Sequence, residues 1–232
     1  MFYEKIKNIG LERKNTEFPF FMDNPKISKN KWILLIIGSI ILLLCSTSFG
    51  ESDLSTIIVV LVSIIIPLYT FKGHWKEIFK KPEINDIWVI LFCLICDGIL
   101  TLTLSSLLGD IGISGYDNSW LNYNIFDLIF VFIQLLWEEI LRFIPFISLL
   151  YLSYKYTANR NLSIIIGTIF CLIVFGLMHT STYGDAFYSL ITIGFGSLFL
   201  AYSYLRTKNL LVAYILHLLI DFSIFALEII GI

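Results

Sequence analysis

Long apolar stretches alternate with short polar connections over most of the chain, and they indicate the architecture. They run approximately over Trp32–Ser48, Leu54–Phe71, Ile87–Leu108, Ile125–Leu152, Leu162–Met178, Ala186–Leu205 and Leu210–Ile230. Each is long enough to cross the hydrocarbon core of a bilayer as a helix. None has the period-two alternation of a barrel strand. The pattern therefore predicts an all-α fold, a polytopic membrane helix bundle with about seven transmembrane helices.

The composition supports a membrane protein. Of the 232 residues, 57% are hydrophobic and 15% are charged, whereas a soluble domain needs more charged surface to cover such a core. This balance excludes collagen, disorder, repeat solenoids and nucleic-acid binding, and it makes membrane lipid the expected surrounding. All four cysteines lie in apolar runs, so we interpret even the Cys93-x-x-Cys96 pair as helix packing.

Charge asymmetry predicts the orientation. Residues 1–31 form the only long polar segment, which we expect to be cytoplasmic, with Phe2, Ile6 and Ile9 on a short interfacial helix; residues 32–232 form the transmembrane domain. Fifteen of the 16 Lys and Arg residues fall in segments on one side of the predicted membrane, and the connections 50–53, 109–124 and 180–185 carry only acidic charges. By the positive-inside rule, the amino terminus is cytoplasmic and the carboxyl terminus is outside.

The sixteenth cation, Arg142, lies in the middle of the fourth apolar stretch. An ionised residue there is costly and needs a partner inside the protein. Glu138 and Glu139 precede it by four and three residues, so both can lean towards the guanidinium on a helix. Such a pair is either a structural clamp or part of a site, and two carboxylates beside one arginine leave a site that attracts a proton or a cation.

Two of the three histidines also belong to apolar stretches. His179 closes the fifth, one turn after Phe175, and His217 lies in the seventh, one turn before Asp221, whose carboxylate can orient the imidazole. A lone membrane histidine is often a hydrogen bond between helices. Acids, arginine and histidines on three stretches together predict one buried polar site at a helix junction. Asp97 either lines this cavity or satisfies hydroxyl groups of its own helix.

Three motifs in order resemble the CPBP family of intramembrane proteases, which includes the CAAX prenyl endopeptidases and Abi-like proteins of bacteriocin processing and immunity. The family pattern is Glu-Glu-x-x-x-Arg, Phe-x-x-x-His and His-x-x-x-Asn or Asp on successive membrane helices. Here Phe175-Gly-Leu-Met-His179 and His217-Leu-Leu-Ile-Asp221 match it. The first motif, Glu138-Glu139-Ile-Leu-Arg142, departs from the family pattern because it is one residue short, so Arg142 is not at the position of the family arginine. The resemblance covers residues 125–230.

The resemblance implies an intramembrane endopeptidase that cleaves a membrane-associated peptide or protein, in a bacterial plasma membrane. By analogy Glu138 is the base that activates water and His179 helps to hold that water. His217 and Asp221 stabilise the oxyanion, and Glu139 orients the site with Arg142, beside Phe175.

The cofactor requirement is left open by the residues. Glu138, His179 and His217 suit a zinc site by donor type, but the His-Glu-x-x-His of zincins is missing. We favour glutamate-driven catalysis without a cofactor, with zinc as the alternative.

Other functions fit parts of the pattern. Titratable groups at mid-membrane also suit a proton-coupled transporter, although no inverted repeat is evident. A non-catalytic immunity or scaffold protein of the same fold is favoured by the shortened first motif. Gly112-Ile-Ser-Gly115 matches the rhomboid Gly-x-Ser-Gly, but it lies in a polar connection with no helix directly after the serine. The substrate and the oligomeric state are not predicted.

Overall fold

Helices are the regular elements of the described part of the chain, as predicted. The computed structural model describes residues 12–13, 16–115 and 125–230, so the predicted interfacial helix of Phe2, Ile6 and Ile9 lies outside the described residues. After the short η1 (Phe21–Asp23), the helices are α2 (Lys29–Cys45), α3 (Asp53–Thr70), α4 (Trp75–Ile78), α5 (Asp86–Asp110), α6 (Ile125–Thr157), α7 (Arg160–Met178), α8 (Thr180–Tyr183), α9 (Ala186–Tyr188), α10 (Leu198–Thr207) and α11 (Leu210–Ile230), with the 3-10 turn η2 (Ser46–Ser48) and the π-helix η4 (Ser189–Phe195).

The predicted apolar stretches all coincide with helical segments, and the sixth is built from α9, η4 and α10. Five described segments are long and apolar enough to cross a membrane: Lys29–Ser48, Asp53–Thr70, Asp86–Asp110, Arg160–Met178 and Ala186–Thr207. Leu210–Ala226 is a shorter apolar helix. Helix α6 carries the charged residues Glu138, Glu139 and Arg142 in its middle. An integral membrane helix bundle is therefore indicated, and seven crossings stay a prediction.

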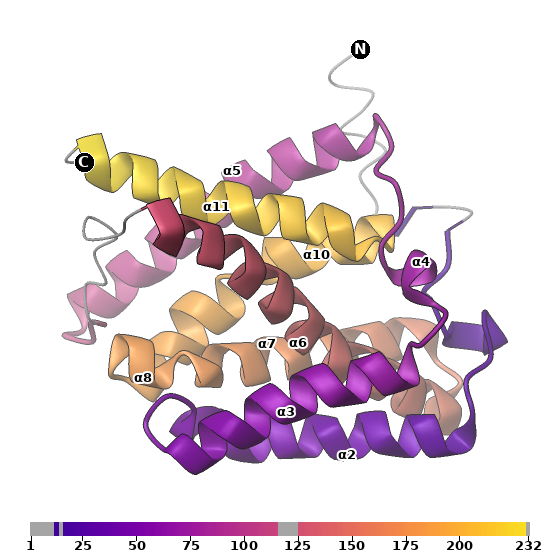
Figure 1. Ribbon diagram of the computed structural model, residues 1–232. Helices are drawn as coiled ribbons and strands as arrows, with labels where there is room; N and C mark the ends of the chain where they lie inside the picture. The colour runs from indigo at the N-terminus through magenta and orange to yellow at the C-terminus, as the bar shows by residue number, and fades with distance from the viewer. Residues whose placement is uncertain (1–11, 14–15, 116–124, 231–232) are drawn as a thin grey trace.

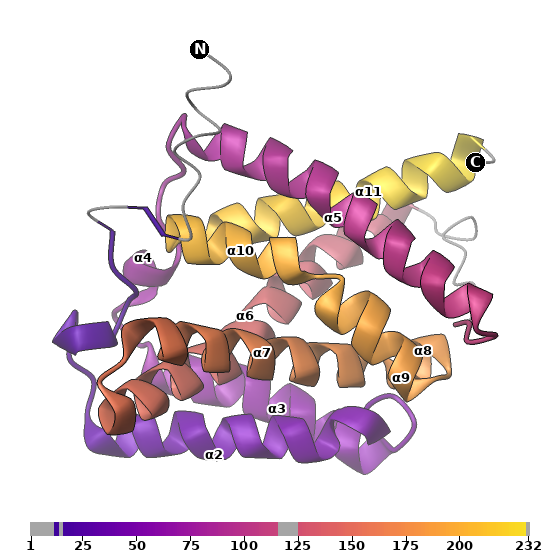
Figure 2. The same ribbon diagram turned by 180° about the vertical axis from the view of Figure 1, so that it is seen from behind.

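The helices form two layers joined by the oblique helix α6. Helices α2 and α3 lie side by side along one edge of the molecule, and α5, α10 and α11 lie together towards the opposite edge (Figures 1 and 2). Helix α6 runs obliquely between them and contacts α2, α7 and α11. Because α6, α7 and α11 carry the three sequence motifs, this packing decides where the motif residues meet.

Two glycines let α7 approach the π-helix η4 closely. A Cβ atom on Gly176 would lie 2.8 Å from the Cα of Gly194, and one on Gly194 would lie 2.7 Å from the carbonyl oxygen of Leu172. Such short contacts between backbones need small residues, as at many membrane helix interfaces. The contact fixes the end of α7 from which His179 projects.

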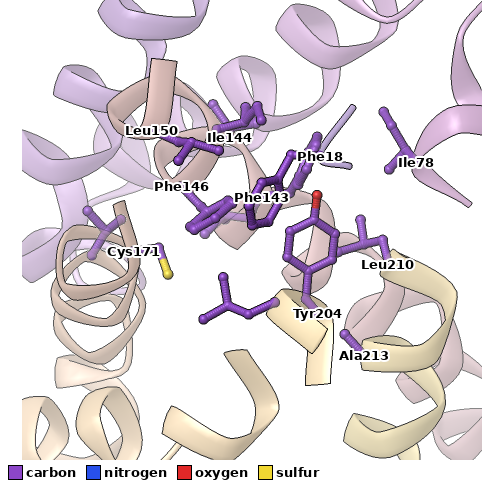
Figure 3. Close-up of a cluster of buried hydrophobic side chains, with 14 of the residues drawn as sticks. Phe18, Ile78, Phe143, Ile144, Phe146, Leu150, Cys171, Tyr204, Leu210 and Ala213 are labelled. Carbon is purple, nitrogen blue, oxygen red and sulfur yellow. The ribbon is translucent and has the colours of Figure 1, made fainter. Parts of the chain in front are cut away.

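The N-terminal segment closes one end of the bundle with an aromatic cluster (Figure 3). The ring of Phe18 is fully buried, with its centroid 5.5 Å from that of Phe146 and 6.1 Å from that of Tyr204. The ring of Phe143 is 5.6 Å from Tyr204. Burial of four aromatic rings contributes several kcal/mol of apolar transfer free energy. The described part of the N-terminal segment is therefore packed onto the helices.

Candidate active site

One large cavity, of about 950 Å³, brings residues of all three motifs together. Its walls come from α3, α5, α6, α7, α11 and the segment from α8 to η4. The titratable side chains that line it are Asp97, Glu138, His179, Tyr183, Tyr188, His217 and Asp221. Lining residues of apolar and aromatic character, among them Trp137 and Ile220, make up most of the remaining wall. A mostly apolar cavity with a few converging polar groups is the usual form of a ligand or active site.

Glu139 lies behind this cavity and connects two motifs. Its side chain is 1% exposed, and its Oε1 atom accepts a hydrogen bond from Nδ1 of His217 at 2.7 Å. The same oxygen contacts the guanidinium of Arg142 through an ion pair. Arg142 therefore balances the charge of Glu139, and Glu139 fixes the imidazole of His217 so that its Nε2 edge faces Glu138 and Asp221.

Glu138 points away from Arg142 and into the cavity. Its Oε1 atom accepts a hydrogen bond from the amide nitrogen of Gln134 at 2.9 Å, one turn earlier on α6. Its Oε2 atom lies 3.9 Å from Nε2 of His217, and Oδ1 of Asp221 lies 3.8 Å from the same nitrogen. These separations exceed a direct hydrogen bond, and a water or a substrate oxygen between the groups can contact both.

His179 is the last residue of the Phe175–His179 motif and directly follows the end of α7. Its Nδ1 atom is 2.8 Å from the carbonyl oxygen of Phe175, which makes Nδ1 the donor and leaves Nε2 as the free ring nitrogen. The ring of Phe175 lies between several groups of the site, 4.6 Å from the ring of His179, 6.2 Å from that of His217 and 4.7 Å from the Cζ atom of Arg142. Phe175 thus separates the Arg142 charge from the cavity and stabilises it by a cation–π contact.

The structure differs from the sequence interpretation in two contacts. Only Glu139 pairs with Arg142, although both acids can reach it by helical spacing. The hydrogen bond that orients His217 comes from Glu139 and not from Asp221. Both differences have one cause: α11 packs against α6, so an acid on the neighbouring helix reaches Nδ1 while the acid one turn away on α11 is next to Nε2.

Some residues of the site were missed by the sequence analysis. Gln134 precedes Glu138 by four residues, so helical spacing allows a hydrogen bond between the two side chains. The sequence analysis considered charged side chains first and therefore did not select this neutral residue. Tyr183 and Tyr188 come from the short segments after α7, whose course the sequence does not predict. Asp97, in contrast, was a candidate from the sequence with two possible roles: it lines the cavity from α5, is 5% exposed, and its Oδ1 atom has no hydrogen-bond partner among the described residues.

Other candidates from the sequence lie apart from this cavity. Cys93 and Cys96 are free thiols on α5, and Cys93 packs in the apolar core. Ser114 of the rhomboid-like tetrad is exposed in the connection after α5 and does not line the cavity. The third histidine, His74, which was not a candidate, lies beside Glu77 after α3 and does not line the cavity either.

The donor set proposed for zinc does not converge in this arrangement. The described residues contain no group of three or more His, Cys, Asp or Glu side chains placed to hold a metal ion. Nδ1 of His217 bonds Glu139 and Nδ1 of His179 bonds a backbone carbonyl, so Nε2 is the ring nitrogen that each histidine has free.

Comparison with known proteins identifies the segment that carries the motifs. Residues 120–223 match the family model described as type II CAAX prenyl endopeptidase Rce1-like. Neither a comparison with curated proteins nor one with solved structures finds a match. The matched residues extend from α6 to α11 and include every residue of the three motifs.

Proposed function

We propose that this protein is an intramembrane endopeptidase, because residues 120–223 match the model of the Rce1-like type II CAAX prenyl endopeptidases, a family of proteases. Its substrate is a membrane-associated peptide or protein, hydrolysed by water that Glu138 activates. The observation that carries the proposal is the shared cavity, which is lined by Glu138 of α6, His217 of α11 and His179 directly after α7.

The attack step uses the Oε2 atom of Glu138 and the Nε2 atom of His179, because the Oε1 atom of Glu138 bonds Gln134 and the Nδ1 atom of His179 bonds Phe175. The carboxylate of Glu138 takes a proton from water, while Nε2 of His179 holds the same water in place. The water oxygen then forms a bond to the carbonyl carbon of the scissile peptide. A positioned base of this kind contributes about 10²–10⁴-fold to a rate.

The oxyanion is stabilised on the α11 side of the cavity. Protonated His217 donates from Nδ1 to Glu139 and from Nε2 to the carbonyl oxygen, which becomes negative as the tetrahedral intermediate forms. Asp221, 3.8 Å from Nε2, supports the positive imidazole. Because Glu139 and Arg142 already fix the ring, little reorganisation is needed when the charge develops.

The collapse step returns the proton. The C–N bond breaks, protonated Glu138 gives its proton to the leaving amine, and the products are a carboxylic acid and an amine. Glu138 therefore acts first as base and then as acid, and no residue forms a covalent intermediate.

The proposal is tested with purified protein and a fluorogenic peptide library. The cleavage rate is compared among wild type, Glu138→Gln, His179→Ala and His217→Ala, with His74→Ala as a matched histidine control. Loss of cleavage in the first three variants, with activity retained in the control, supports the proposal. Equal cleavage in all variants, or peptide binding without cleavage by wild type, contradicts it; binding alone would indicate a scaffold or immunity role, and peptide-driven proton flux a transporter.

Catalysis without a metal cofactor is part of the proposal. An active preparation is treated with a chelator and analysed for bound zinc. We expect activity to persist with less than one zinc per ten molecules. Loss of activity on chelation, restored by added zinc, would overturn this part while leaving the protease assignment intact.

A further inference from the structure

The cavity and the basic end of the bundle lie at opposite ends of the same helices. Helix α7 begins at Arg160, which forms ion pairs with Glu12 and Glu17 of the N-terminal segment, and it ends at Met178, directly before His179. Its 19 residues span about 27 Å at 1.5 Å per residue, close to the thickness of the hydrocarbon core. The Arg160 end and the His179 end of α7 are therefore at different membrane surfaces.

The basic end is marked by several connections. Lys208, between α10 and α11, binds Glu12 at 2.7 Å, so the α6–α7 and α10–α11 connections meet the same N-terminal segment. The connection after α3, with α4, lies towards this end as well (Figures 1 and 2). It contains Lys72, Lys76, Lys80 and Lys81.

The opposite end carries the cavity wall. Phe49, Thr182, Tyr183 and Tyr188 line the cavity and belong to the connections at the α8 end of the molecule (Figure 1). These connections are in contact, since a Cβ atom on Gly50 would lie 2.5 Å from Oγ of Ser181. The charged residues within 49–52 and 179–185 are Glu51 and Asp185, both acidic.

The depth of the reactive groups agrees with access from this end. Glu138 is the fourteenth of the 33 residues of α6, whose first residues follow the acidic connection and whose last turn contains Lys155. The lining residues of α6 run from Val131 to Leu141, the middle residue of the helix, and none comes after it. On α11 they run from His217 towards Ile224, away from Lys208.

Because lysine and arginine mark the cytoplasmic side of membrane proteins, the end without them is the non-cytoplasmic side. We propose that the cavity opens to the non-cytoplasmic face, and that the substrate is a peptide segment on that face or entering from its leaflet. The statement that a substrate enters the cavity rests on the proposed function, whereas the side of the membrane on which the cavity opens does not depend on it. A peptide must then be exported or membrane-inserted before it is cleaved.

The side of access is tested by thiol labelling in intact cells. A single cysteine is introduced into a functional variant from which the native cysteines have been removed. Thr182→Cys places it at the cavity mouth, and Lys72→Cys places it at the basic end as the matched control; both positions are exposed. A membrane-impermeant maleimide should label Thr182→Cys in intact cells and Lys72→Cys only after permeabilisation, with at least about a tenfold difference. Labelling of Lys72→Cys alone in intact cells would overturn the proposal.

Cleavage in sealed vesicles separates this inference from the function. The fluorogenic peptide that the detergent-solubilised protein cleaves fastest is made membrane-impermeant and added to right-side-out or inside-out vesicles. The proposal expects cleavage in right-side-out vesicles only. Cleavage only in inside-out vesicles overturns the side of access and leaves the protease assignment standing. If the predicted labelling is found but neither vesicles nor detergent preparations cleave any peptide, the protease assignment fails and the side of access stands.

Discussion

Glu139 on α6 and His217 on α11 share a 2.7 Å hydrogen bond, although 78 residues separate them in the chain. The contact holds two of the three motif helices in register and fixes which edge of the imidazole faces the cavity. It also gives the second glutamate of the Glu138-Glu139 pair a task that differs from that of the first.

Replacement of Glu139 by glutamine should reduce catalysis more than binding. Glutamine keeps the size of the side chain but removes the negative charge of the carboxylate, which pairs with Arg142 and accepts the hydrogen bond from Nδ1 of His217. We expect kcat to fall about 100-fold and KM to change by less than about threefold, because the orientation of His217 matters most in the transition state. Steady-state kinetics measure both. Glu51→Gln, at an exposed position, is the control, and a kcat within twofold of wild type would contradict the assigned task.

Gly176→Ala should destabilise the bundle. The new Cβ atom would lie within 3 Å of the Cα atoms of Gly194 and Leu190, so α7 has to move away from η4. Overpacking of this kind costs about 1–3 kcal/mol. Thermal unfolding in detergent measures the loss. Gly98→Ala is the matched control, since nothing lies within 4 Å of its Cβ position, and equal stability of the two variants would refute the close-packing argument.

Phe175→Leu should lower both the stability of the protein and its cleavage rate without leaving a large cavity. Leucine keeps apolar volume but loses the ring that lies 4.7 Å from the Arg142 guanidinium and 4.6 Å from the His179 ring. We expect a stability loss of about 1–2 kcal/mol and a lower cleavage rate. Phe187→Leu, at an exposed position, should change neither quantity. Unfolding midpoints and rates are measured on the same preparations, and matching values for Phe175→Leu and Phe187→Leu would argue against the ring contacts.

Glu12 should stabilise the end of the bundle where α7 begins, in a pH-dependent way. Burial alone would raise the pKa of Glu12, but hydrogen bonds and charges from Arg160 and Lys208 outweigh it and lower the pKa from 4.5 to about 2. A depressed folded-state pKa means that this stabilisation is complete above about pH 4.5 and is lost as the pH falls towards 2. Glu12→Gln also removes the carboxylate that forms the ion pair with the buried Lys208, which destabilises the protein near pH 6.

The measurement is the unfolding midpoint of wild type and Glu12→Gln at pH 6 and pH 3. The difference between the two proteins should shrink at pH 3. Glu83→Gln is the control, because its carboxylate is 63% exposed in its ion pair with Arg13 and should contribute little at either pH. A difference that grows as the pH falls has the wrong sign for this explanation.

The helices were predictable because each depends on a local property. A run of apolar residues such as Leu162–Met178 must be helical in lipid, whatever its neighbours are, since the backbone satisfies its own hydrogen bonds. The sixth stretch was predicted as one span, but its division into α9, η4 and α10 depends on the approach of Gly194 to Gly176, which is a contact between helices.

The identities of the candidate site residues were also visible, but their pairing was not. Helical spacing allows Arg142 to reach Glu138 or Glu139, and only the position of α11 decides that Glu139 is shared with His217. On ideal parallel helices His179 and His217 lie at different depths. The crossing of α6, α7 and α11 and the position of His179 after the last turn of α7 place both at one cavity. Gln134 and the tyrosines after α7 can be recognised as site residues only from that geometry.

The cleavage efficiency of Glu138→Gln is the most direct test of the central claim. kcat/KM is measured for wild type and the variant on the same peptide in the same detergent, with unfolding midpoints as a check of the fold. The account predicts a fall of about 10³-fold or more with a midpoint within 2 °C of wild type, because glutamine keeps the shape of the side chain and cannot take a proton from water. A folded Glu138→Gln protein that retains kcat/KM within about twofold would contradict the account.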